Sequence, residues 1–109
     1  MRGCLRLLGD LFGALARAEF CLGDLDRARE NAKTAFAYAL GPKKWHIMGN
    51  ICETMAIIDV TDGKPELGLR HNKEAVRYFE TIGDFDRAET SKRLLTDNND
   101  IPWCKRFDK

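Results

Sequence analysis

Two acidic residues, Glu19 and Asp59, lie 40 residues apart on otherwise apolar helical stripes. The residues that precede them at helical spacing are Phe12, Leu15 and Ala16 in one stripe and Cys52, Met55 and Ala56 in the other. Paired carboxylates can carry out acid–base or metal chemistry. One helical hairpin apart, however, they would be separated by about 10 Å, the usual distance between packed helices. Because charges that face a core are normally paired, we expect a structural role, with Lys33 and Lys73 as the basic partners.

The histidines and cysteines lack the spacing of a catalytic or metal site. His46 and His71 form no HxxxH or HExxH pattern. The four cysteines are dispersed without a CxxC pair, which is typical of reduced thiols in a cytosolic protein. Gly9 and Gly13 lack the GK[ST] ending of a phosphate loop. We therefore predict a cytoplasmic protein that is not an enzyme and that uses no metal and no cofactor.

The charge balance argues against nucleic-acid and membrane partners. The chain has 18 basic and 17 acidic residues, a formal net charge of +1. A nearly neutral chain lacks the broad positive field that would hold nucleic acid or an anionic membrane. The basic and aromatic residues of 43–46 form only one short cluster. No apolar run approaches the roughly 18 residues of a transmembrane helix.

About five helices are expected to position these residues. Glycines recur at Gly3, Gly23, Gly41, Gly63 and Gly83, and apolar residues between them recur at i, i+3 and i+4. Helices are predicted over residues 5–22, 25–40, 44–60, 65–81 and 84–97, the last capped by Asp84. No segment has the period-2 alternation of a strand, so the predicted fold class is all-α.

Each predicted helix has one face that should be buried. These faces are Leu5, Leu8, Leu11, Phe12, Leu15 and Ala16 in the first helix; Leu25, Ala28, Ala32, Ala35, Phe36 and Ala39 in the second; Trp45, Met48, Ile51, Cys52, Met55 and Ala56 in the third; Gly68, His71, Asn72, Ala75, Val76, Phe79 and Ile82 in the fourth; and Phe85, Ala88, Leu94 and Leu95 in the fifth. The alanine-rich second face should allow a neighbouring helix to approach closely.

The chain also repeats itself. Residues 22–28 (LGDLDRA) return as residues 82–88 (IGDFDRA), and we interpret both copies as helix turns in which glycine makes the turn and aspartate caps the next helix. A shift of 40 residues pairs Gly9 with Gly49, Ala16 with Ala56, Gly23 with Gly63, Lys33 with Lys73, Ala35 with Ala75 and Tyr38 with Tyr78. A two-helix unit of this size cannot bury its apolar face alone and is expected to stack.

Residues 5–96 resemble the tetratricopeptide repeat family, in its variants with repeats of about 40 residues. The resemblance rests on small residues inside the first helices (Ala16, Ala56), on the glycine turns after them (Gly23, Gly63), and on small residues where helices cross (Ala28, Gly68) and hairpins stack (Ala35, Ala75). The family usually has an aromatic residue at the positions of Glu19, Asp59 and Asn72. The resemblance implies a right-handed stack of antiparallel helical hairpins, an α-solenoid in one domain of residues 1–100, with hairpins 5–41 and 44–82 and a half-repeat 84–97.

In this family the first helix of each hairpin lines a concave groove that binds a peptide or a partner helix. Carried over by position, the groove of this chain would present Asp10, Gly13, Arg17, Phe20, Asn50, Glu53, Ile57, Val60 and Lys92. Because Gly13 and Arg17 stand where the family's carboxylate clamp needs other residues, chaperone C-terminal tails are disfavoured. The function we predict is a non-catalytic protein–protein interaction module or scaffold. The alternative is a regulatory or sensing segment of a larger switch protein, such as a transcription regulator or an NTPase.

The tail, residues 101–109, follows a predicted helix stop and carries two large aromatic side chains, Trp103 and Phe107. Terminal hairpins of a stack expose an apolar face, which the tail could cover as a cap. The second interpretation is that the tail docks on a partner or on another copy of the chain. A homodimer through the open ends of the stack is the corresponding assembly, and we favour the cap.

Overall fold

Five helices make up the structure, a computed structural model that describes residues 2–41 and 44–97, with the side chains of residues 7–41 and 44–94. The helices are α1 (Arg2–Cys21), α2 (Leu25–Leu40), α3 (Trp45–Thr61), α4 (Pro65–Thr81) and α5 (Phe85–Asp97). This part of the chain contains no strand, so the predicted all-α class is confirmed. None of these helices is long and apolar enough to cross a bilayer. Residues 101–109 lie outside the described residues, so their capping role stays a prediction.

Local signals explain where the helices begin and end. Three turns contain a glycine in the left-handed region, Gly23, Gly63 and Gly83, with φ of 89°, 80° and 79°. Asp24 then caps α2 by accepting a hydrogen bond from the Arg27 N–H at 3.1 Å. Asp84 caps α5 in the same way, from the Arg87 N–H at 3.2 Å. The repeated segments 22–28 and 82–88 are therefore turn-and-cap units, as predicted.

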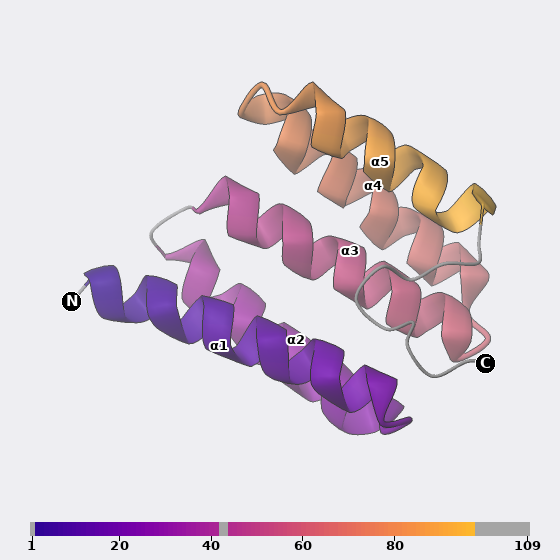
Figure 1. Ribbon diagram of the computed structural model, residues 1–109, viewed down its shortest axis with the longest axis horizontal. Coiled ribbons are helices and arrows are strands. Elements are labelled where there is room, and N and C mark those ends of the chain that lie inside the picture. Colours follow the sequence, from indigo (N-terminus) through magenta and orange to yellow (C-terminus); the bar gives the residue numbers. More distant parts are fainter. Residues whose placement is uncertain (1, 42–43, 98–109) are drawn as a thin grey trace.

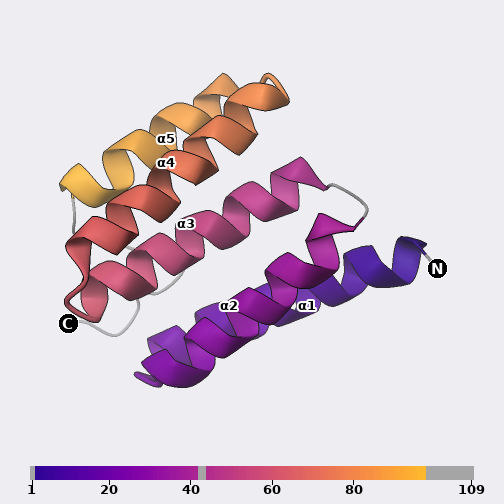
Figure 2. The ribbon, with the colours of Figure 1, turned by 180° about the vertical axis from the view of Figure 1, so that it is seen from behind.

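Consecutive helices run antiparallel and pack mainly on their sequence neighbours (Figure 1). The α1–α2 and α3–α4 pairs are the closest, and α2 contacts α3 while α5 contacts α4. In Figure 1, α1 lies in front of α2 and α5 in front of α4. Seen from behind in Figure 2, α2 and α4 lie on either side of α3. The arrangement gives two faces of interest, one shared by α1, α3 and α5 and the other by α2, α3 and α4.

The centre of the core is α3, which is enclosed on nearly all sides. From Ile47 to Asp59, every residue except Asn50 is buried. The α3–α4 contact is close because Gly68 faces α3: a Cβ there would lie 2.9 Å from the Ala56 carbonyl oxygen and 2.6 Å from Val60 Cγ2. This contact confirms the prediction of a small residue where paired helices cross.

The predicted buried faces are correct for α2 and α3 and only partly correct for the other helices. Ala16 of α1 and Ala88 of α5 are buried as predicted, whereas Ile82, at the end of α4, is 41% exposed. The faces of α2 and α3 are buried or half-buried as expected. On α1, however, Leu11 is 54% exposed and Leu15 40%, and at the start of α5 Phe85 is 65% exposed. Among the described helices, α1 and α5 are the first and the last, and each has neighbours on one side only. Their outer apolar residues consequently meet solvent.

Two described cysteines are in different states. Cys21 is disulfide-bonded, so the expectation of reduced thiols throughout is wrong for this residue. Cys52 is free and fully buried in α3, as its place on a core stripe predicts. Burial, together with the Glu74 carboxylate 3.8 Å from its sulfur, raises the pKa of Cys52 to about 12. Its thiol is therefore unreactive at neutral pH.

Candidate functional site: a polar groove between α1 and α3

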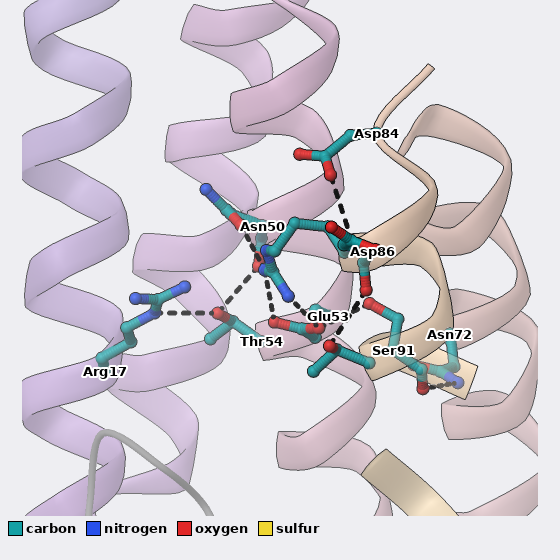
Figure 3. Close-up of polar contacts among 10 residues, drawn as sticks. Arg17, Asn50, Glu53, Thr54, Asn72, Asp84, Asp86 and Ser91 are labelled. Atoms are coloured by element: carbon teal, nitrogen blue, oxygen red, sulfur yellow. Dashed lines mark hydrogen bonds and ion pairs between the residues drawn. The ribbon is translucent and has the colours of Figure 1, made fainter. Parts of the chain in front are cut away.

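A polar network links α5 to α3 (Figure 3). The Arg87 guanidinium donates to Asn50 Oδ1 at 2.7 Å and to the two carboxylate oxygens of Glu53 at 3.1 and 3.4 Å. Ser91 Oγ donates to the same carboxylate. The guanidinium also lies 4.5 Å from the centre of the Phe79 ring. Glu53, only 5% exposed, therefore fixes α5 against α3.

The same network extends to α1 through Arg17. Arg17 Nε donates to Thr54 Oγ1 at 3.3 Å, and Thr54 Oγ1 donates to the backbone oxygen of Asn50 at 3.0 Å. Burial lowers the pKa of Arg17, while the Glu53 carboxylate raises it and the Arg87 guanidinium lowers it further. The guanidinium groups of Arg17 and Arg87 thus both lie near the buried Glu53 carboxylate.

Two recesses that share lining residues lie on this face, and we refer to them together as the groove. The first, of about 120 Å³, lies between α1 and α3 and is lined by Gly9, Asp10, Gly13, Ala14, Arg17, Ile47, Asn50, Ile51 and Thr54. The second, of about 550 Å³, lies around the start of α3 and is lined by Asp10, Lys44, Trp45, His46, Ile47, Asn50 and Ile82. Asp10, Ile47 and Asn50 belong to both recesses. Asn50 therefore stands at the middle of the groove.

The structure brings together some of the residues predicted for the concave face. Asp10, Arg17 and Asn50 all line the groove, together with Gly13. Lys92 lines neither recess, and its ammonium group lies 3.6 Å from Glu80 and 4.0 Å from Glu89. Its position makes it a charged surface residue of α5 beside α4.

The remaining predicted residues are mostly buried. The side chains of Phe20, Glu53 and Ile57 are 9%, 5% and 4% exposed, so they lie beneath the surface and are inaccessible to a ligand. Val60, at 41% exposed, packs close to Gly68 of α4. A serine hydroxyl beside a carboxylate can act as a nucleophile with its base. Ser91 is fully buried with Glu53, however, so this pair is inaccessible to a substrate.

Sequence reasoning missed Arg87, Ser91 and Thr54 as members of the network. A signal for two of them was present in the 40-residue repeat. The shift aligns Arg87 with Ile47 and Ser91 with Ile51, so two polar residues replace two apolar ones at equivalent helix positions. A polar residue at a position that is buried elsewhere in a repeat predicts a hydrogen-bond partner, and here that partner is the Glu53 carboxylate.

The anomalous carboxylates Glu19 and Asp59 are both held by side chains of other helices. Asp59 is 2% exposed, with Oδ1 3.2 Å from Arg29 Nη2 of α2 and Oδ2 2.6 Å from His71 Nδ1 of α4. Glu19 accepts a hydrogen bond from the Asn31 amide of α2. The prediction of a basic partner on a neighbouring helix is confirmed for Asp59 by Arg29 and is wrong for Glu19, whose partner is a neutral amide. The described residues contain no group of three acidic, histidine or cysteine side chains that could hold a metal ion.

The predicted partners Lys33 and Lys73, in contrast, are wrong. Both lysines are exposed, because each lies two residues after the true partner, about 200° further round the helix. The true partners Asn31 and His71 are themselves 40 residues apart. The repeat therefore preserves the position of the contact while its chemistry changes from a neutral hydrogen bond in the first hairpin to an ionic cluster in the second.

Comparison of the chain with protein-family models, with curated proteins and with solved structures gives no match. The resemblance to tetratricopeptide repeats stays a prediction from the sequence, and the function has to be inferred from the geometry of the groove.

Proposed function

We propose that this protein is a non-catalytic interaction module that binds a peptide or a helix of a partner protein in the groove between α1 and α3. The observation that carries this proposal is the state of Asn50. Arg87 holds its Oδ1, and among the described residues nothing accepts a hydrogen bond from its Nδ2. A fixed amide donor in the middle of a groove is suited to a backbone carbonyl of a bound segment.

The architecture that we propose is a tetratricopeptide-like stack of hairpins. The internal repeat supports it, because a shift of 40 residues relates the Glu19–Asn31 contact to the Asp59–His71 contact as well as the glycine turns. Equivalent contacts at equivalent positions are expected when one supersecondary unit occurs twice in a stack.

Charges of both signs line the groove, Asp10 on one hand and Arg17 and Lys44 on the other. Charged side chains of a bound segment would set its register against them. Since the groove is short, we expect weak binding, with a Kd on the order of 1–100 μM.

Panning of a displayed library of random short peptides tests this proposal. We expect a set of short peptides to be enriched, and Asn50→Ala to weaken their binding about tenfold, the effect of one lost hydrogen bond of about 1–1.5 kcal/mol. Asn31→Ala is the matched control, since Asn31 is also half-buried and hydrogen-bonded but lies on α2. Failure to enrich any peptide, or equal weakening by both variants, would contradict the proposal.

A further inference from the structure

A second cleft lies on the opposite side of the molecule, between the two hairpins. It has a volume of about 490 Å³ and lies between α2 and α4, over α3, on the side seen in Figure 2. Its lining residues are Arg29, Lys33, Phe36, Met55, Ile58, Asp59, Lys64, Leu67 and His71. The volume falls within the roughly 300–1,000 Å³ typical of small-molecule sites. None of the groove residues lines it, so the two sites are separate.

Part of the lining of this cleft is apolar. Phe36 of α2, Met55 of α3 and Leu67 of α4 supply its accessible apolar surface, and Ile58 is fully buried beneath them. The Phe36 ring is backed by Tyr78, at 6.4 Å between ring centres, and Tyr78 is stacked on Trp45 at 5.6 Å. These aromatic contacts hold Phe36 in place. A ligand with an apolar body would therefore find a preformed surface.

The rim of the cleft is basic. Its only acidic lining residue, Asp59, is already paired with Arg29 and His71. Asp62 at the edge is paired with Arg29 at 3.1 Å and with Lys64 at 3.5 Å. Lys33 is exposed and has no ion-pair partner among the described residues. The cleft thus offers a cation that no described carboxylate neutralises, beside apolar side chains.

We propose that this cleft binds a small amphiphile with an apolar body and one anionic group, such as a medium-chain carboxylate. The apolar body lies on Phe36, Met55 and Leu67, and the anionic group lies against Lys33. The proposal does not depend on the peptide groove. Because such a ligand contacts α2 and α4 together, it would hold the two hairpins in one arrangement, which is the property that the alternative function of a sensing segment requires.

Titration with sodium decanoate below its micelle-forming concentration tests the proposal. The NMR signals of the Met55 methyl group and the His71 ring report directly on the cleft. We expect saturable, one-site shifts with a Kd below about 1 mM, together with a higher Tm. Decanamide, which lacks the charge, should bind about tenfold more weakly, and decyltrimethylammonium should not shift these signals.

Variants distinguish the cleft from nonspecific binding to exposed apolar residues. Lys33→Glu should weaken decanoate binding about tenfold or more, whereas the repeat-equivalent control Lys73→Glu, exposed on α4 and outside the cleft, should leave it within about twofold. Leu67→Trp, which fills the cleft, should also weaken it. Shifts that do not saturate, equal Kd values for Lys33→Glu and Lys73→Glu, or equally tight binding of the cationic amphiphile would each overturn the proposal.

Discussion

The equivalent faces of α1 and α3 carry similar side chains in opposite environments. On α1 the residues Leu7, Leu11 and Leu15 are 67%, 54% and 40% exposed. Forty positions later, Ile47, Ile51 and Met55 of α3 are 9%, 3% and 9% exposed. The two faces differ in their neighbours, since α3 has helices on both sides while α1 is the first helix described. Position in the array, more than residue type, therefore decides which apolar residues are buried.

The largest difference in stability between equivalent variants of α1 and α3 is expected for their carboxylates, Glu19 and Asp59. Asp59→Ala removes the common partner of Arg29 and His71, and we expect it to lower the free energy of unfolding by about 3–5 kcal/mol. Glu19→Ala removes one half-buried hydrogen bond to Asn31, at a cost of about 1 kcal/mol. Urea unfolding of both variants measures these values. Equal costs would show that the ionic cluster of the second hairpin contributes no more than the neutral contact of the first.

The next largest difference in stability is expected for the equivalent apolar residues Leu11 of α1 and Ile51 of α3. Ile51→Ala leaves a cavity in the core and should cost about 2–4 kcal/mol. Leu11→Ala, at the same repeat position, should change stability by less than about 0.5 kcal/mol, since the side chain is exposed. Denaturant midpoints of the two variants check the contrast. A comparable loss at Leu11 would mean that its outer face is covered in solution.

A glycine pair gives effects of opposite sign. At Gly9 an added Cβ would meet its nearest atom, the Ala35 backbone oxygen, at 3.6 Å, an ordinary contact. Gly9→Ala should therefore stabilise the protein by up to about 1 kcal/mol through helix propensity. At Gly49 the Cβ would lie 2.8 Å from the fully buried Phe79 ring, so overpacking should exceed that gain and leave a net cost of about 1 kcal/mol. Thermal unfolding of both alanine variants tests the signs, and stabilisation by both would contradict the tight α3–α4 contact.

The smallest predicted effect is a pH dependence of the stability that arises from Cys52 of α3 and has no counterpart at the equivalent position of α1. Cys52 takes the repeat position of Phe12, and its pKa is raised to about 12, chiefly by burial. As pH rises above the ordinary thiol pKa of 9.0, the unfolded chain ionises while the folded thiol stays protonated, so stability falls. Near pH 10 this loss should be about 1 kcal/mol relative to pH 8. In Cys52→Ala the loss should shrink by that amount, and an unchanged pH profile would argue against ionisation of this thiol.

Helix bounds were predictable from the sequence because they depend on local signals. The observed α2 and α4 have the predicted bounds, since Gly23, Asp24, Gly41 and Pro65 act within a turn of each helix end. The buried stripe of α3 was predictable for a similar reason: it is apolar on several sides, so any rotation of the helix buries most of it.

Contacts between helices were less predictable. The partners of Glu19 and Asp59 depend on how α2 and α4 are rotated about their axes. The sequence prediction therefore chose lysines that lie two residues after the true partners, Asn31 and His71. Arg87 reaches Glu53 across 34 positions in sequence. Asp10, Arg17 and Asn50 were found because repeat position places them on one face. The cleft on the other side depends on how the two hairpins pack against each other, and the periodicity of the sequence does not predict that packing.

The most direct test of the peptide groove is a map of amide chemical-shift changes on adding a peptide selected by panning. We expect the largest changes at Asp10, Arg17 and Asn50 and along the neighbouring turns of α1 and α3, with little change at Lys33 and Leu67 of the opposite cleft. Changes confined to α2 and α4, with none at Asn50, would contradict the assignment of the groove.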